Sequence, residues 1–369
     1  MADIKLLLTG ATGYIGGSIL TQLLQSELPI IKRIKVTAVV RQESQAALLR
    51  EHGVNAIVFS GLEDTELLQQ LASEHDMVIN TASTFHPASA KAMILGLAAR
   101  KKQTTQAVHF IHTSGTGSIA DLPLSSTYLD NRKHSDKDDT YSYLKKREEE
   151  GPFPQRSTDM LVVDTGLQAD VKTYTLMSPT IFGVGTGHFN KLSIQVPFFM
   201  RAAVEAKHAQ VIGEGASIWS DIHIDNLSDF YEFLISKILS DEDVPHGKKG
   251  IYFTETGEHT WMEVSKAVAK AGLKLGALPT EEVEKLSLEQ AAEKWVGGNL
   301  MFTELGFASN SRSQADLAKE LGWTPKVGLL NLEHACLEEF RAVMSETQKD
   351  DKLLTKANVA KKVSEGKSD

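Results

Sequence analysis

The chain has 369 residues, and its 39 basic and 48 acidic side chains give a formal net charge of −9. Hydrophobic residues make up 41% of it, enough for a large core, and the length suggests two domains or one large domain with an appendage. The acidic balance argues against nucleic acid as the main partner, because phosphate binding needs clustered Lys and Arg. The single cysteine, Cys336, excludes an intrachain disulfide framework and a cysteine-rich zinc site.

No apolar run approaches the roughly 18–20 residues of a membrane-spanning helix. The N-terminal run Ile4–Leu8 is too short for the core of a signal peptide, and it leads directly into a glycine turn. We therefore expect a cytoplasmic protein with no membrane partner.

The first 115 residues alternate between short apolar runs and stretches with helical periodicity. Runs that are apolar throughout are typical of strands buried on both faces of a parallel sheet. The predicted strands are Ile4–Thr9, Ile34–Val40, Ala56–Ser60, Met77–Asn80 and Val108–His112. The predicted helices between them are Tyr14–Gln25, Gln42–His52, Asp64–Ser73 and Ala88–Lys101. This alternation predicts an α/β fold with a Rossmann-like, doubly wound parallel sheet.

The pattern changes after Gly115, where residues 116–155 are polar, charged and irregular. This insertion is either a solvated surface segment or a substrate lid. Beyond it, helices are predicted at Ser157–Asp164, Val196–Lys207, Asn226–Leu239, Met262–Ala271 and Gln314–Leu321, and strands at Lys172–Ile181 and Gly250–Thr254.

Three regions follow from this reading. Residues 1–185 form the Rossmann domain with its insertion, and residues 186–345 mainly form a smaller mixed α/β substrate lobe. A segment near 213–230 is expected to return to the Rossmann domain. Residues 346–369 are charged and free of aromatic side chains, and we expect a flexible tail there.

The strongest local motif is the turn from Gly10 to Gly16, with glycines at 10, 13 and 16 directly after a strand and at the start of a helix. One glycine permits the tight turn, one lets the backbone approach a pyrophosphate, and one lets the helix pack on the sheet. The helix N-terminus then presents free N–H groups to the anion. The motif predicts a phosphate-binding turn.

This turn resembles the GxxGxxG turn of the extended and atypical short-chain dehydrogenases/reductases, which include the NAD-dependent epimerase/dehydratase group and the NmrA-like group. Further segments resemble that superfamily, and they follow one another along this chain in the same order as in its members. They are Val78–Ser83 on the fourth strand, Phe110–Gly115 on the fifth, Met177–Gly183 beside the nicotinamide, Ile222–Leu227 in the substrate lobe and Leu317–Lys326 near the C-terminus.

The resemblance implies a nicotinamide dinucleotide cofactor. The residues that it places around the cofactor are Gly10, Thr12, Gly13, Tyr14, Ile15, Gly16, Arg41, Leu62, Thr81, Ala82, Ser83, Thr113, Pro179 and Ile181. An acidic residue after the second strand binds the ribose 2′-hydroxyl of NAD, whereas an arginine pairs with the 2′-phosphate of NADP. Here Arg41 follows the strand and no acid occurs until Glu43. The cofactor is therefore expected to be NADP(H) rather than NAD(H).

Catalysis in this superfamily uses a tyrosine as general acid/base, a lysine four residues later, and a serine or threonine that polarises the substrate carbonyl. The YxxxK match in this chain runs from Tyr141 to Lys145. With Ser114 and Thr116 after the fifth strand, these are the predicted catalytic residues. The alternative for Tyr141 and Lys145 is a surface helix that carries Lys, Arg and Glu.

A second register remains open. The helix beginning near Arg156 also fits the family's catalytic helix, with Asp159 as its acidic residue. In this register Gly151 and Gln155 take the places of the tyrosine and the lysine, and Gly115 takes the place of the serine.

The resemblance implies an NADP-dependent oxidoreductase that acts on a small carbonyl or hydroxyl compound bound between the Rossmann domain and the lobe. Three alternatives stay open: a sugar-nucleotide epimerase or dehydratase, an NmrA-like dinucleotide-sensing regulatory protein without turnover, and isomerase-type or ether-reductase-type chemistry. A homodimer is possible by the same resemblance.

Overall fold

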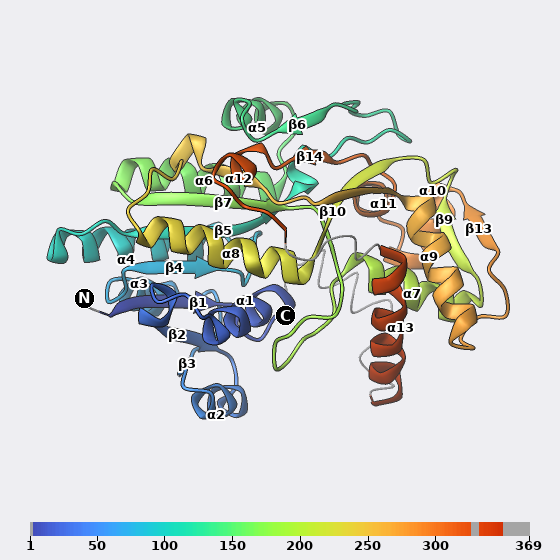
Figure 1. The fold of residues 1–369 in the computed structure, drawn as a ribbon. Coiled ribbons are helices and arrows are strands. Elements are labelled where there is room, and N and C mark those ends of the chain that lie inside the picture. The colour runs from blue at the N-terminus through green and yellow to red at the C-terminus, as the bar shows by residue number, and fades with distance from the viewer. Residues whose placement is uncertain (1–2, 326–331, 350–369) are drawn as a thin grey trace.

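The computed structural model describes residues 3–325 and 332–349, and a seven-stranded parallel sheet forms its centre (Figure 1). The strands, in spatial order, are β11 (Ile251–Phe253), β7 (Lys172–Ser178), β5 (His109–Gly115), β4 (Met77–Asn80), β1 (Ile4–Thr9), β2 (Ile34–Val40) and β3 (Asn55–Val58). Leu6, Leu7 and Leu8 of β1 are all fully buried. A continuous apolar run is what a strand covered on both faces requires.

Helices cover both faces of this sheet, which confirms the doubly wound α/β fold. On one face α1 (Tyr14–Gln25) packs against α8 (Ile224–Leu239), and Figure 1 shows both in front of the sheet. On the other face α3 (Thr65–Ala72), α4 (Pro87–Thr104) and α6 (Pro154–Ala169) pack in a row. The short helix α2 (Glu43–Glu51) connects β2 to β3.

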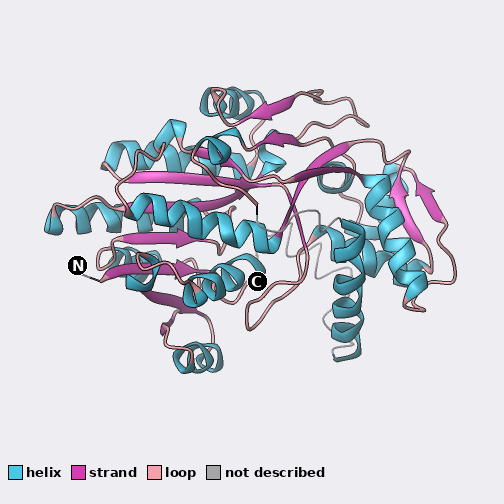
Figure 2. Cartoon of the chain, in the orientation of Figure 1, coloured by secondary structure: helices cyan, strands magenta, loops and turns pink. Residues whose placement is uncertain are grey.

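Much of the described chain after Pro179 forms a smaller lobe with its own core (Figure 2). Two small sheets, β12-β10-β8 and β13-β9, lie among its helices. The strands are β8 (Thr180–Phe182), β9 (Ala209–Ile212), β10 (Ile218–His223), β12 (Gly257–Thr260) and β13 (Val283–Leu286). The helices are α7 (Gln195–Ala206), α9 (Trp261–Lys274), α10 (Leu288–Val296), α11 (Leu300–Phe307) and α13 (Leu332–Lys349).

The chain moves between the two parts at Pro179. The run expected to be one strand, Lys172–Ile181, divides there into β7 of the large sheet and β8 of the lobe. Proline has no N–H to donate to a strand partner, so a ladder ends at such a position. The return to the large sheet is made by α8, which packs on α1, and by β11, which pairs with β7. The strand β10, within the expected return segment, pairs with β8 and β12 instead.

Residues 116–155 are more ordered than their composition suggested. They contain β6 (Lys133–Ser135) and α5 (Thr140–Glu150), and β6 pairs with β14 (Arg312–Gln314). The carboxylate of Asp136 accepts hydrogen bonds from the backbone N–H groups of Phe253, Asp316 and Leu317. These contacts fasten the segment to β11 and to the helix α12 (Asp316–Glu320).

The C-terminal part also differs from the expectation. The helix α13 extends to Lys349, so the start of the expected tail is helical, and residues 350–369 lie outside the described residues. Within the described ranges, no helix combines the length and the apolar character that a bilayer crossing requires.

Candidate dinucleotide and active site

The glycine turn has the conformation that its sequence predicts. Gly10 has φ of +79°, a value that residues other than glycine rarely adopt. The N–H of Gly13 donates to the carbonyl oxygen of Gly10 at 2.9 Å and closes the turn. A Cβ atom on Gly16 would lie 2.2 Å from that same oxygen. Only glycine therefore lets α1 pack this closely against the turn.

The end of β4 lies against the same turn. The hydroxyl of Thr81 donates to the carbonyl oxygen of Thr9 at 2.7 Å, and a Cβ atom on Gly10 would lie 2.8 Å from the backbone nitrogen of Ala82. Ser83 follows, buried, and its hydroxyl accepts a hydrogen bond from the N–H of Phe85. The structure thus brings together two segments that lie about seventy residues apart in the sequence and that were both predicted to bind the cofactor.

The N-terminus of α1 fits an anionic dinucleotide. Gly13 is the N-cap residue and supplies no side chain, and the first turn carries no acidic residue. The first N–H groups of the helix therefore stay available for phosphate oxygens, and the helix dipole favours negative charge there. Thr12 and Ile15, beside Gly13, are half-buried.

Arg41 and Leu62 follow the neighbouring strands. The register pairs Thr9 of β1 with Val39 of β2, which places Arg41 just beyond the same sheet edge with an exposed side chain. Leu62, after β3, is half-buried against the core between α3 and the sheet. Their contacts with a cofactor stay predictions.

The residues at the end of β5 point to different partners. The hydroxyl of Thr113 lies 2.5 Å from that of Tyr231 on α8. Ser114 accepts a hydrogen bond from Thr84 at 3.3 Å. The hydroxyl of Thr116 is buried and has no hydrogen-bond partner among the described residues. Ser114 is thus the hydroxyl group that this strand end can offer to a ligand, whereas the predicted residue Thr116 is fully buried.

Tyr141 and Lys145 lie elsewhere. The Tyr141 hydroxyl donates to the carboxylate of Asp164 at 2.6 Å, and this hydrogen bond raises the pKa of the tyrosine to about 12. The ammonium of Lys248 lies 4.6 Å from the centre of its ring, while Lys145 is exposed. Figure 1 shows α5 beyond α6 and far from α1. The structure does not bring this pair to the glycine turn.

The first turn of α6 lies at the strand ends instead. Gln155 is buried there, and a Cβ atom on Gly115 would lie 2.9 Å from its Nε2 atom. One turn later, Asp159 accepts a hydrogen bond from the Ser118 hydroxyl at 2.9 Å. This arrangement agrees with the second register, in which Gln155 takes the place of the lysine. Gly151, in the place of the tyrosine, caps α5 and is exposed.

Beyond Gly183, the sequence predicts no element or role for the segment after β8. Residues 183–193, here called the strap, lie along the glycine turn. The N–H of Asn190 donates to the carbonyl oxygen of Thr12 at 3.2 Å, and the N–H of Thr186 donates to the Ser18 hydroxyl at 3.2 Å. The Tyr14 hydroxyl donates to the carbonyl oxygen of Gly183 at 2.6 Å. The signal in the sequence was the small and flexible character of Gly183, Gly185 and Gly187.

Pro179 and Ile181 lead into the strap. Pro179 is buried between β7 and β8, and Ile181 packs against the core of the large sheet. The structure places both immediately before Gly183, and their contacts with a nicotinamide stay predictions.

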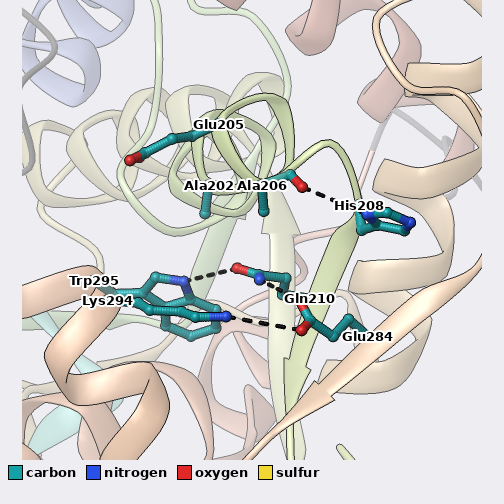
Figure 3. A pocket seen from close by; sticks show the side chains of 8 residues that line it. All are labelled: Ala202, Glu205, Ala206, His208, Gln210, Glu284, Lys294 and Trp295. Atoms are coloured by element: carbon teal, nitrogen blue, oxygen red, sulfur yellow. Dashed lines mark hydrogen bonds and ion pairs between the residues drawn. The ribbon is translucent and has the colours of Figure 1, made fainter.

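A separate groove of about 480 Å³ lies in the lobe (Figure 3). At its floor the indole N–H of Trp295 donates to the side-chain oxygen of Gln210 at 3.1 Å, and Gln210 donates to Glu284. The groove lies between α7, β9, β13 and α10. It shares no residue with the glycine turn or with the predicted catalytic residues.

The fold and the turn define a Rossmann-type protein with a dinucleotide-binding site. A family model described as "NAD dependent epimerase/dehydratase family" matches residues 6–245. The chain belongs to this family.

Individual relatives agree with this assignment. An oxidase named ucsJ from Acremonium sp. is 29% identical over 305 residues, which cover 78% of this chain and 84% of the relative. The fold is similar to that of a dTDP-glucose 4,6-dehydratase from Bacillus anthracis in complex with NAD (TM-score 0.61, 15% identity, 94% and 98% covered). It is also similar to a UDP-glucuronic acid 4-epimerase from Bacillus cereus in complex with NAD (TM-score 0.59, 14% identity, 93% and 100% covered).

Proposed function

We propose that this protein is an oxidoreductase that uses NADP(H) to reduce or oxidise a small carbonyl or hydroxyl compound. The observation that carries the proposal is the glycine turn. Gly10 and Gly16 let the turn, the residues after β4 and the start of α1 pack closely together, and the N-terminus of α1 is free of acidic side chains that would repel a phosphate. The name of the Acremonium relative, an oxidase, supports redox chemistry.

The preference for NADP(H) rests on charge at the end of β2. Arg41 is exposed at that sheet edge. The nearest acid, Glu43, bonds to Arg50 along α2 at 2.5 Å, so its carboxylate is held by another partner. A guanidinium beside the adenosine ribose favours a 2′-phosphate, because the two ions form charge-assisted hydrogen bonds. The related structures named above contain NAD, and the choice between the two cofactors therefore depends on Arg41.

The bound nicotinamide supplies or accepts the hydride. Of this chain's residues, Ser114 offers a hydroxyl group near the end of β5 that can hydrogen-bond a substrate oxygen. Gln155 can also donate through its amide, but it cannot exchange a proton near neutral pH. We propose that the substrate proton is exchanged with water, since the Tyr141 hydroxyl is held by Asp164.

A second candidate is a dinucleotide-binding regulatory protein that has no turnover. The observation that favours it is the pair Gly151, which caps α5, and Gln155, in the first turn of α6, because neither can serve as an acid or base. Epimerase or dehydratase chemistry on a sugar nucleotide, as named for the structural relatives, is the third candidate within the family.

A nucleotide titration followed by a turnover assay tests the proposal. Tryptophan fluorescence is followed as NADPH or NADH is added to the wild type, to Arg41→Ala and to Arg33→Ala, which alters the opposite end of β2. We expect NADPH to bind at least about tenfold more tightly than NADH, a difference of about 1.4 kcal/mol, and only Arg41→Ala to remove it. Turnover of a carbonyl panel with NADPH then distinguishes the enzyme from the regulator. If neither nucleotide binds, the proposed function is wrong.

A further inference from the structure

A buried carboxyl group lies at the root of the strap. Glu339, on α13, is fully buried, which is rare for an acidic side chain. It accepts hydrogen bonds from the backbone N–H of Gly183 and from the Ser193 hydroxyl, the latter at 3.4 Å. Its other oxygen, Oε2, has no partner among the described residues. Glu339 therefore holds both ends of the strap, Gly183 and Ser193.

Burial favours the neutral form of Glu339, while the hydrogen bonds from Gly183 and Ser193 and the charge of Arg201 act in the opposite direction and to a smaller extent. The ionisable groups that face it are Tyr14 of α1, Arg201 of α7 and Cys336 of α13. Arg201 is the cation among them, and its guanidinium pairs with Glu346 at 3.1 Å instead. Burial therefore raises the pKa of Glu339 to about 8. A charged carboxylate with an unpaired oxygen in this interior would be costly.

Gly183 is fixed from three directions. Its φ is +94°, and a Cβ atom there would lie 2.3 Å from the Nε2 atom of His223, the N-cap residue of α8. Tyr14 of α1 donates to its carbonyl oxygen, and Glu339 of α13 accepts from its N–H. Segments from the beginning, the middle and the end of the chain thus meet at one glycine.

We propose that Glu339 is a positioning residue: it fixes Gly183 and keeps the strap, residues 183–193, against the phosphate-binding turn. The strap reaches that turn through the bond from Asn190 to Thr12. The C-terminal helix α13 would then support the cofactor site indirectly. Glu339 bonds to the strap, and the strap bonds to the glycine turn. The effect on cofactor affinity rests on the proposed function above.

The charge state of Glu339 determines how the stability of the closed strap depends on pH. A carboxyl group whose pKa is raised in the closed state stabilises that state while it is neutral. This contribution is complete below the ordinary pKa of a glutamate and is lost as the pH rises through about 8. The strap should therefore loosen between pH 7 and pH 9. In the variant Glu339→Gln, whose amide has the same shape and carries no charge, the strap should stay closed at both pH values.

The test compares wild type with Glu339→Gln, Glu339→Ala and the control Glu333→Gln. Glu333 lies on the same helix but is exposed and pairs with Lys270. Amide hydrogen exchange of the strap is measured without nucleotide at pH 7 and, after correction for the intrinsic rate, at pH 9. The Kd for NADPH is measured at both values. A peptide from α9 reports whether the lobe stays folded.

We expect Glu339→Ala to exchange strap amides about tenfold faster at pH 7, because a buried N–H loses its acceptor. Wild type and Glu333→Gln should lose strap protection and bind NADPH about tenfold more weakly at pH 9, where a group with a pKa of about 8 is mostly charged. Glu339→Gln should show neither change.

Two results would overturn the proposal: wild-type strap protection in Glu339→Ala, or equal losses of strap protection in wild type and Glu339→Gln from pH 7 to pH 9. If Glu339→Ala unfolds, as the α9 peptide would show, the comparison of wild type with Glu339→Gln tests the proposal by itself. If wild type binds neither nucleotide, the proposed function fails, and the exchange data on the free protein still decide the role of Glu339.

Discussion

The Nε2 atom of His112 lies 3.6 Å from the Oδ1 atom of Asp159, with both side chains fully buried. On its other side the His112 ring meets the amide of Asn80 at 3.1 Å, and Asn80 accepts from the Thr9 hydroxyl at 2.7 Å. This row of polar groups crosses β1, β4 and β5 and ends on α6. It links the strand that begins the glycine turn to the helix that carries Gln155.

Removing the charge from this row should be costly. We expect Asp159→Asn to lower the free energy of unfolding by about 1–2 kcal/mol, because the buried hydrogen bond from the Ser118 hydroxyl then has a neutral amide as its acceptor in place of the carboxyl group. Asp170→Asn is the matched control, since Asp170 follows the same helix and forms an exposed ion pair with Lys101. Its effect should stay within about 0.5 kcal/mol. Urea denaturation measures both, and equal effects would contradict the prediction.

The glycine turn offers a steric prediction. Gly16→Ala should abolish nucleotide binding, because its Cβ atom would lie 2.2 Å from the carbonyl oxygen of Gly10 and α1 must move away. Gly306→Ala on α11 is the control, since the nearest atom to its Cβ would be 3.9 Å away. Isothermal titration with NADPH and NADH provides the measurement. Retained binding by the Gly16 variant would show that the dinucleotide does not use this turn.

Removing the Tyr141 hydroxyl distinguishes a structural role of this residue from a catalytic one. Tyr141→Phe should destabilise the fold by about 1 kcal/mol, the usual contribution of one hydrogen bond, since the hydroxyl binds Asp164. It should leave kcat with any substrate found above half of the wild-type value. A loss of a hundredfold or more in kcat without a matching loss of stability would restore Tyr141 as the general acid/base.

Acid should destabilise the protein partly through His109. Burial lowers the pKa of this ring to about 3, whereas the unfolded chain has a pKa near 6.5. Between these values the unfolded state binds one more proton, so stability is lost as the pH falls below about 6.5, by up to about 1.4 kcal/mol per pH unit. His109→Gln should reduce the difference in urea stability between pH 7 and pH 5. The exposed His208→Gln should not reduce it.

The sequence predicted the large sheet well because its strands are buried on both faces. Ile4–Thr9, Ile34–Val40 and Met77–Asn80 agree with β1, β2 and β4 at both ends. The helix α5 appeared in the sequence only as one alternative for Tyr141 and Lys145, because its apolar positions are few: Tyr141 and Leu144 are its buried hydrophobic residues, among Lys, Arg and Glu. A charged stretch of this kind shows little periodicity, although packing on α6 is enough to hold it helical.

The site was predictable only where local sequence determines geometry. The turn at Gly10 requires glycine for reasons within a few residues, so its motif is visible in one chain. The partner of Tyr141 lies on the next helix, and that of Gly183 lies at the C-terminal end of the fold. No local pattern reports such contacts. The motif from Tyr141 to Lys145 therefore matched the family's spacing while α5 and α6 placed it elsewhere.

The position of β11 affects when the large sheet can fold during synthesis. Residues 251–253 complete one edge of a sheet whose first strand begins at Ile4, and Asp136 is bonded to backbone that reaches Leu317. On a ribosome, the N-terminal half therefore emerges with an open sheet edge and several unmet backbone partners. We expect its folding to wait for the last third of the chain, during which an exposed edge strand is a target for chaperones and a risk for aggregation.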